Sequence, residues 1–264
     1  MLTRLATGLL LAPLLVLLLV EGPAWAVVTV FVAASGMCVH ELLAMAMPGR
    51  RLERVVGVAT MAALQLVSWF YPEDLALPLV LAMAVPGFAV LARPLPIETA
   101  LMRIATVWAA WLYVVLPLSF GLELAREPGR LPVVFALSLV FAGDTFAYFA
   151  GRALGRHKLY PVVSPKKTVE GAIGGLLGSV GVAAGFAVIF WPGRVSPVYA
   201  GLIGLVGGAV AQMGDFVESL IKRSCGVKDS GTILPGHGGM LDRLDGVLFA
   251  FPVVFAFLRP VFRM

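Results

Sequence analysis

The chain has 264 residues, of which 60% are hydrophobic and only 13% are charged, with a formal net charge of +5. Its mean hydropathy is +0.96. Soluble domains carry about a quarter charged residues, so a soluble core could not hide this much apolar surface. The composition therefore excludes an ordinary soluble domain and predicts an integral membrane protein. The apolar runs are long and do not alternate, which favours spanning helices over a closed barrel.

Apolar runs long enough to span a membrane recur along the whole sequence. They lie at about 5–20, 26–47, 55–71, 75–92, 104–122, 131–150, 171–191, 198–221 and 246–261. The first run also resembles a signal peptide, because Arg4 precedes it and Ala24-Trp25-Ala26 resembles a cleavage site; we expect it to be retained. The prediction is an all-α, polytopic fold of about nine transmembrane helices. We expect one catalytic domain, 1–264, with an N-terminal helical region (1–130) and a motif-bearing region (131–264).

Positive charge is distributed unevenly between the segments that join these runs. If the N-terminus lies inside, most lysines and arginines fall on the cytoplasmic segments, as the positive-inside rule requires. This orientation places the two long polar loops, 151–170 and 222–245, in the cytoplasm. We therefore predict a multi-pass protein of the inner (plasma) membrane whose polar chemistry faces the cytosol.

The cysteines and one glycine-rich stretch are predicted to have structural roles. Cys38 and Cys225 form no metal or disulfide pattern, and Cys38 is expected to be a small buried hydrophobic residue. The stretch GAIGGLLGSVG at 171–181 lacks the Lys-Ser/Thr of a phosphate-binding P-loop. Its glycines recur at i and i+4, which predicts close packing between helices.

The first polar cluster is GDTFAYFAGRALGRHKLYPVVSPKKTVEG, at 143–171. Asp144, Tyr148 and Arg152 fall on one helical face. They could form a purely stabilising arrangement, but ionisable residues at membrane depth are costly and point to function. The SPKKTVEG loop is either a topology determinant that contacts anionic lipid or part of a substrate site. Its candidate substrate-binding residues are Ser164, Lys166, Lys167 and Thr168.

The second cluster is AQMGDFVESLIKR, at 211–223. Asp215, Glu218, Ser219 and Lys222 form a single stripe on an otherwise apolar helix. Two carboxylates one turn apart suit a hard cation with oxygen ligands. The alternative is a Glu218–Lys222 ion pair at i, i+4 with Asp215 solvated.

The third cluster, 219–245, contains a glycine turn between two acidic helix ends. Pro235-Gly236-His237-Gly238-Gly239 leaves its backbone N–H groups free to approach phosphate oxygens. His237 is as easily structural as substrate-binding. Asp242 and Asp245 then repeat the i, i+3 spacing of carboxylates. The cations around them are Lys222, Arg223, Lys228 and Arg243.

All three clusters combine carboxylates with cations. Carboxylates hold Mg²⁺ and cations hold polyphosphate in phosphoryl and nucleotidyl transfer, where positioning and charge neutralisation dominate catalysis. The residues alone thus predict a membrane-embedded, metal-dependent enzyme that acts on phosphorylated substrates.

The segment SLIKRSCGVKDSGTILPGHGGMLDRLD, at 219–245, resembles the signature of the phosphatidate cytidylyltransferase family. Its elements Ser-x-x-Lys-Arg, Lys-Asp-x-Gly, Pro-Gly-His-Gly-Gly and Asp-Arg-x-Asp stand in register. The upstream segments GDTFAYFAGRALGR and SPKKTVEG also look like those of the family. The resemblance covers about 143–245.

The resemblance implies transfer of CMP from CTP to phosphatidic acid, giving CDP-diacylglycerol and pyrophosphate, with Mg²⁺ and an undetermined second cation. The implied catalytic residues are Asp215, Lys222, Arg223, Asp242 and Arg243. The implied substrate-binding residues are Ser164, Lys166, Lys167, Thr168, Ser219, Lys228, Gly236, His237, Gly238 and Gly239. The implied metal ligands are Asp215, Asp242 and Asp245, with Asp144 and Glu218 as further candidates.

The sequence also indicates the partners of the protein and the functions that compete with this interpretation. The expected partners are CTP, phosphatidic acid, membrane lipids and, as an open prediction, a second copy of the chain; nucleic acid is not expected. One competitor is a cytidylyltransferase for an ether-lipid phosphate. Others are an ion-coupled transporter, which predicts repeated halves that the sequence lacks, and a lipid-binding scaffold, which needs no paired carboxylates.

Overall fold

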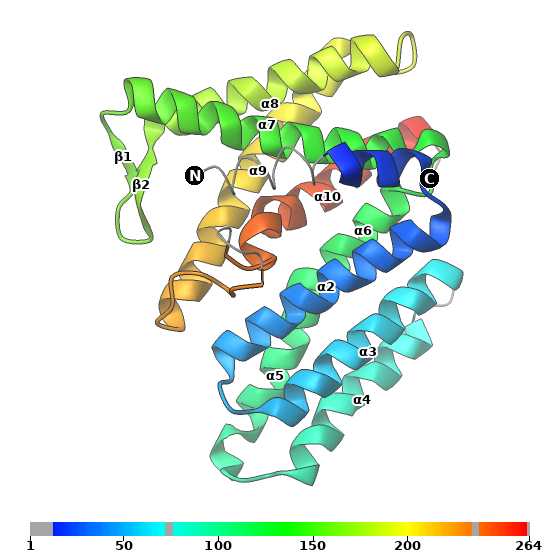
Figure 1. Ribbon diagram of the computed structural model, residues 1–264, viewed down its shortest axis with the longest axis vertical. Helices are drawn as coiled ribbons and strands as arrows, with labels where there is room; N and C mark the ends of the chain where they lie inside the picture. The colour runs from blue at the N-terminus through cyan, green and yellow to red at the C-terminus, as the bar shows by residue number, and fades with distance from the viewer. Residues whose placement is uncertain (1–12, 72–75, 234–237, 263–264) are drawn as a thin grey trace. The chain divides into compact units, whose positions relative to one another are not determined.

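The computed structural model describes residues 13–71, 76–233 and 238–262. It is helical apart from one small hairpin (Figure 1). The chain divides into two compact units, which are described separately. The first unit comprises Met1–Leu14, Gly22–Leu122 and Asp229–Asp242, and the second comprises Leu15–Glu21, Glu123–Lys228 and Arg243–Met264.

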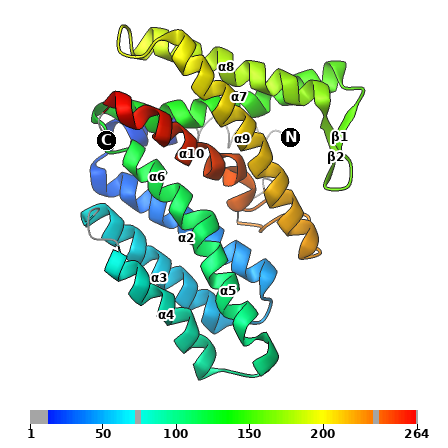
Figure 2. The same ribbon diagram turned by 180° about the vertical axis from the view of Figure 1, so that it is seen from behind.

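The first unit is a layer of neighbouring helices. It contains α2 (Ala24–Ala46), α3 (Arg51–Phe70), α4 (Ala76–Ala92), the short η1 (Ile97–Thr99), α5 (Ala100–Ala110), the π-turn η2 (Trp111–Val115) and most of α6 (Leu116–Leu124). Helices α2, α3 and α4 lie side by side in both ribbon views (Figures 1 and 2). Arg103 of α5 forms a buried ion pair with Glu53 of α3. Nearby, the Trp111 indole donates to the Gly57 carbonyl across 2.9 Å.

The second unit is built around a helical hairpin and two further helices. It contains η3 (Pro128–Arg130), α7 (Leu131–Leu154), β1 (Lys158–Tyr160), β2 (Ser164–Thr168), α8 (Val169–Phe190), α9 (Pro197–Ser224) and most of α10 (Leu241–Phe262). Local sequence sets the start of α9, because Pro197 fits the first helical turn and the Ser196 hydroxyl accepts from the Tyr199 N–H across 3.1 Å.

Glycines allow α7 and α8 to pack closely, as predicted for the 171–181 stretch. A Cβ atom at Gly178 would lie 2.6 Å from the Phe146 side chain, and one at Gly175 would lie 2.9 Å from the Gly143 carbonyl. Small residues let helices approach in this way where lipid provides little driving force for association. The prediction of glycine-mediated helix packing is confirmed.

The all-α, polytopic architecture is also confirmed. Within the described residues, 6 helices are long and apolar enough to cross a membrane: Ala24–Ala46, Ile97–Leu124, Leu131–Leu154, Val169–Phe190, Pro197–Ser224 and Leu241–Phe262. The predicted 75–92 span is a shorter apolar helix, Leu77–Ala92. Helix α3 carries Arg51, Glu53, Arg54 and Gln65, which lower its hydropathy. Of the 5–20 run, residues 13–20 are helical and residues 5–12 lie outside the described part of the chain.

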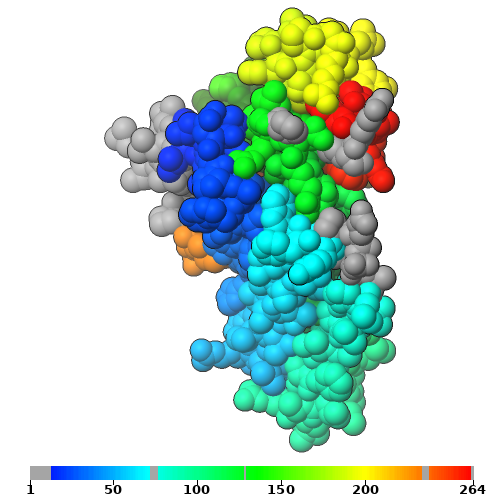
Figure 3. Space-filling view, turned by 90° about the vertical axis from the view of Figure 1, so that its right-hand side faces the viewer, coloured from blue at the N-terminus to red at the C-terminus, as the bar shows by residue number. Residues whose placement is uncertain are grey.

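The outer surface of α4 is apolar, as lipid contact requires. Large hydrophobic side chains are exposed along it, among them Leu77, Val80, Leu81, Phe88 and Leu91. Helices α3 and α4 contribute the cyan to blue-green surface of Figure 3. Such a patch would be an aggregation liability in water, so its natural surroundings are acyl chains.

The predicted polar loop 151–170 contains regular structure, which corrects the expectation of a simple loop. Helix α7 continues to Leu154, and β1 and β2 then form an antiparallel hairpin that pairs Lys158 with Thr168 and Tyr160 with Ser164. Glu170, at the start of α8, accepts the Arg156 N–H across 3.1 Å and lies 2.6 Å from His157 Nδ1. These contacts fix the start of the hairpin to α8, and its other end, β2, leads directly into α8.

Candidate active site

A pocket of about 440 Å³ lies within the second unit, between α7, the hairpin, α8 and α9. Its walls combine small residues with ionisable ones. The charged side chains that line it are Asp144, Arg152, Lys166, Lys167 and Asp215. A hollow of this size with both cations and carboxylates suits a polar, phosphorylated ligand.

Helix α7 supplies one wall of the pocket through a single face. Asp144, Tyr148 and Arg152 all line the pocket, as their i, i+4, i+8 spacing predicts. The Arg152 guanidinium donates to the Tyr148 hydroxyl across 3.0 Å. This contact matches the stabilising arrangement that the sequence left open, but the three side chains also face the pocket together.

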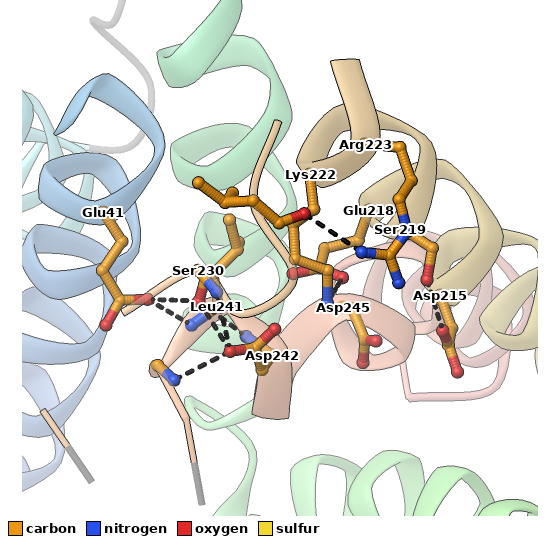
Figure 4. A network of polar contacts seen from close by, with 12 residues as sticks. Glu41, Asp215, Glu218, Ser219, Lys222, Arg223, Ser230, Leu241, Asp242 and Asp245 are labelled. Atoms are coloured by element: carbon orange, nitrogen blue, oxygen red, sulfur yellow. Dashed lines mark hydrogen bonds and ion pairs between the residues drawn. The ribbon is translucent and has the colours of Figure 1, made fainter. Parts of the chain in front are cut away.

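The second wall carries an ion pair between the hairpin and α9. Lys167 Nζ lies 2.5 Å from Asp215 Oδ2, and the two side chains are 29% and 32% exposed. The Lys167 ammonium also lies 4.2 Å from the centre of the Phe216 ring. Ser219 Oγ, one turn along α9, lies 3.4 Å from Asp215 Oδ1 (Figure 4). The pocket therefore holds a cation beside a carboxylate that remains reachable by solutes.

Three aspartates of the second unit interact through their charges. Asp144, Asp215 and Asp245 repel one another, and Lys167 offsets part of this repulsion. Arg243 contributes a further attraction to Asp144. Neighbouring like charges are costly without a counter-ion, so this group is suited to a cation.

Magnesium fits the chemistry of these donors. In the part of the chain that the structure describes, no group of three His, Cys, Asp or Glu side chains is arranged to hold a metal ion. Mg²⁺, however, commonly uses one or two carboxylates and completes its shell with substrate phosphates and water. Asp215, with Asp144 and Asp245 near it, supplies hard oxygen donors of that kind.

The residues predicted to share one face of α9 have different surroundings. Glu218 is fully buried and pairs with Lys222, which is 9% exposed. This is the i, i+4 ion pair that the sequence left as the alternative. Neither side chain lines the pocket, whereas Asp215 does. Arg223 is exposed and donates to the Val227 carbonyl across 3.1 Å.

The hairpin residues differ in their surroundings. Thr168 is buried and caps α8, because its hydroxyl accepts from the Gly171 N–H across 3.1 Å. Lys166 is exposed in the pocket wall, and Ser164 is half-buried at the start of β2. Of this segment, the two lysines are the groups best placed to meet an anion.

Residues 229–242, the middle part of the signature 219–245, belong to the first unit, where Asp242 accepts hydrogen bonds from their backbone. Asp242 Oδ2 accepts from the Ser230 N–H across 2.9 Å and from the Gly239 N–H across 2.8 Å. Gly238 has a φ of +80°, which favours glycine. Gly236 and His237 lie outside the described residues. Lys228 and Arg243, on either side of the segment, are exposed.

Sequence reasoning missed Glu41, which contacts the signature segment within the first unit. Its carboxylate accepts from Ser230 Oγ across 2.8 Å and from the Met240 and Leu241 N–H groups across 2.9 Å each (Figure 4). The signal was an acidic residue inside the apolar run 26–47, which is as costly as Asp144. It was overlooked because no motif surrounds it. Gln212, a further pocket residue, was also missed.

Fold and pocket together define a helical membrane protein with a polar pocket suited to phosphorylated ligands. Comparison with known families makes this class specific. Residues 2–261 match the model of the cytidylyltransferase family. The chain belongs to this family.

Its relatives carry a common name. The chain is 43% identical over 154 residues to the phosphatidate cytidylyltransferase of Staphylococcus saprophyticus. This matched region covers 58% of this chain and 56% of that protein. It is 45% identical over 129 residues to that of Staphylococcus epidermidis, covering 49% of each. It is 45% identical over 130 residues to that of Staphylococcus aureus, again covering 49% of each. The chain thus spans about half the length of the curated relatives it matches.

Proposed function

We propose that the protein transfers CMP from CTP to phosphatidic acid, forming CDP-diacylglycerol and pyrophosphate. The observation that carries this proposal is the pocket in which Lys167 pairs with Asp215 beside Asp144. Membership of the cytidylyltransferase family and the names of the relatives support the same reaction.

The proposed step joins two anions. A lipid phosphate oxygen attacks the α-phosphorus of CTP, the new oxygen–phosphorus bond forms, and the bond to the bridging oxygen breaks so that pyrophosphate leaves with its electron pair. The attacking phosphate is ionised near neutral pH, so no strong base is needed. What the chain must supply is neutralisation and alignment. Lys166, Lys167 and Arg152 are the pocket cations available for this role.

We assign Mg²⁺ to the carboxylates of the second unit, with Asp215 and Asp245 as ligands and Asp144 as a further candidate. When bound, the ion would withdraw charge from the CTP phosphates. Asp242 stays a predicted metal ligand, although its Oδ2 already accepts two backbone N–H groups. Glu218 stays one too, although it is paired with Lys222. The second cation remains a prediction.

The membrane arrangement is part of the proposal. We infer about nine spanning helices, a cytoplasmic N-terminus, and pocket-bearing loops on the cytoplasmic face of the plasma membrane. The excess of lysine and arginine on segments 151–170 and 222–245 supports this orientation. Association of two copies is a further prediction, checked by the mass of the purified protein in detergent.

Turnover of the purified protein tests the function. With Mg²⁺, CTP and phosphatidic acid, we expect CDP-lipid and pyrophosphate in equal amounts. Asp215→Asn keeps the side-chain size but removes the charge that faces Lys167, so activity should fall on the order of 10²-fold or more. Asp242→Asn should also abolish turnover.

Matched variants sharpen that result. Glu98→Gln, on an exposed residue outside the signature and the predicted site residues, serves as the control and should retain activity. Full activity of Asp215→Asn would refute the metal assignment. Absence of turnover with any lipid phosphate, ester or ether, would refute the function itself.

A further inference from the structure

Arg152 is a pocket cation that no described carboxylate neutralises. It lies in the last turn of α7, is exposed, and lines the pocket of the second unit. The ion pairs among the described residues include Lys167 with Asp215 but none to Arg152. A guanidinium carries five N–H donors, and the described hydrogen bond of Arg152 uses one of them. Its charge and most of its donors are therefore available to an anion.

Tyr148 holds the Arg152 guanidinium in place. The two residues are four apart on α7, so they lie on the same helical face. The Tyr148 hydroxyl accepts from Arg152 Nη1 across 3.0 Å, and both side chains line the pocket. A planar guanidinium that is already oriented loses less freedom when it binds a ligand. The pair thus presents one oriented cation in the pocket wall.

Arg152 lies apart from the carboxylates of the pocket. Asp144 precedes it by eight residues on α7, which is about 12 Å along a helix axis. The charges that act on Asp144 come from Asp215, Lys167 and Arg243. The pocket therefore has a part where carboxylates and Lys167 meet, and a separate part at Arg152.

The surface next to Arg152 is apolar. Tyr148 and Leu159 line the pocket and are 59% and 37% exposed, and Phe149 and Leu154 of α7 are 62% and 65% exposed. Helix α7 is long and apolar enough to cross a membrane, so acyl chains are the natural surroundings of these side chains. The hairpin that carries Leu159 follows this end of α7 (Figure 1). The Arg152 part of the pocket thus borders on a surface suited to lipid.

A ligand that matches both features has an acidic head and apolar chains. Arginine forms two parallel N–H···O bonds with a phosphate, and a phosphate monoester carries roughly 1.5 to 2 negative charges near pH 7. Acyl chains beside Phe149 and Leu154 would keep their contact with the bilayer while the phosphate reaches Arg152. Arginine near the end of a spanning helix extends to the head-group level in the same way.

We propose that Arg152, oriented by Tyr148, binds the phosphate of the lipid substrate, a phosphate monoester that carries acyl chains. This inference rests on the proposed function. It divides the pocket cations between the two substrates: Arg152 binds the lipid, whereas Lys167, paired with Asp215, meets the nucleotide. Arg152 is thus a residue that determines which lipid head group the pocket accepts.

The test compares Arg152→Gln with Arg156→Gln. Arg156 is an exposed arginine four residues further along, and it does not line the pocket. In micelles that contain phosphatidic acid and Mg²⁺, we would measure kcat and both KM values. Loss of a charge-assisted hydrogen bond costs roughly 10- to 100-fold in affinity. Arg152→Gln should raise KM for phosphatidic acid by that factor and leave KM for CTP unchanged, and Arg156→Gln should keep both values.

Two conservative variants refine the result. Arg152→Lys keeps the charge but loses the two-pronged geometry, so its KM for phosphatidic acid should lie between those of the wild type and Arg152→Gln. Tyr148→Phe removes only the hydroxyl and should raise the same KM by a smaller factor. A larger change in KM for CTP than for phosphatidic acid would overturn the proposal, as would equal changes in Arg152→Gln and Arg156→Gln. If Arg152→Gln does not fold, wild-type KM values in both conservative variants would contradict it.

Binding without turnover separates this inference from the proposed function. Native mass spectrometry of the purified protein in detergent, without CTP, measures the retained phosphatidic acid and, for comparison, phosphatidylcholine. The wild type should retain phosphatidic acid preferentially, Arg152→Gln should lose this preference, and excess inorganic phosphate should not displace the lipid. This pattern without any turnover would refute the proposed reaction while supporting the lipid site. Equal retention by the wild type and Arg152→Gln, or displacement by inorganic phosphate, would refute the lipid site.

Discussion

Lys167 is the pocket cation that we expect to meet an anionic substrate. It pairs with Asp215 and lies over Phe216, so its ammonium is held in place although it is 29% exposed. Oriented charges need no rearrangement when a phosphate arrives. The single lysine is thus expected to matter more than its exposure suggests.

Lys167→Met should lower kcat/KM on the order of 10²-fold, because the charge that neutralises substrate phosphates is lost. Lys158→Met is the matched control, since Lys158 is an exposed residue of the same hairpin and does not line the pocket. Steady-state kinetics with CTP as the varied substrate measures both. Equal losses in the two variants would mean that general surface charge, not the pocket, is responsible.

Some residues of the candidate site could be identified from the sequence and others could not. Asp144, Lys166, Lys167 and Asp215 were identified because charge in an apolar chain is conspicuous, and the pocket brings them together. The sequence could not decide whether Glu218 binds a metal or pairs with Lys222, because residues on one helical face can contact different neighbours. Glu41 could not be found at all by spacing, because its partners lie almost two hundred residues further along the chain.

At the scale of elements, the packing of α7 against α8 rests on small residues. The i, i+4 glycines of 171–181 were readable in the sequence, but their partners on α7 were not. Phe146 and Gly143 occupy the space that side chains on α8 would need. The hairpin β1–β2 was missed because strands this short, on a polar segment, carry almost no periodic signal.

Gly178→Ala should destabilise the protein by about 1–3 kcal/mol, because the added methyl group would meet Phe146 in a packed interface. Gly181→Ala on the same helix is the control. A Cβ atom there meets nothing within 4 Å, so stability should be unchanged or higher. Thermal unfolding in detergent, followed by tryptophan fluorescence, measures the difference. Similar midpoints for both variants would show that the α7–α8 contact is looser than described.

At the scale of the whole molecule, composition predicted the class of fold more reliably than the number of spans. Each of the 6 long apolar helices of the described residues overlaps a predicted run and extends beyond it at one end or both. Helix α3 was harder to classify, since the buried polar residues Glu53 and Gln65 lower its hydropathy. Inside the protein, Glu53 pairs with Arg103 and Gln65 donates to the Ser35 hydroxyl. The division into two units, with residues 229–242 of the signature in the first, follows from contacts that no local pattern reveals.

Orientation is testable with single cysteines in a background where Cys38 and Cys225 are replaced. Lys158→Cys and Arg194→Cys flank the candidate span α8. A membrane-impermeant maleimide should label Lys158→Cys only in inside-out vesicles and Arg194→Cys only in right-side-out vesicles. Labelling of both from the same side would contradict a spanning α8, and the reverse pattern would contradict the cytoplasmic placement.

Nucleotidyl transfer to a lipid phosphate can be followed through the fate of labelled phosphorus. Purified protein is given Mg²⁺, phosphatidic acid, and CTP labelled at either the α- or the γ-phosphorus, and the lipid is then extracted. We expect the α-label to enter the lipid and the γ-label to leave as pyrophosphate, and Asp215→Asn to prevent both. Entry of the γ-label into the lipid, or transfer of neither label, would contradict it.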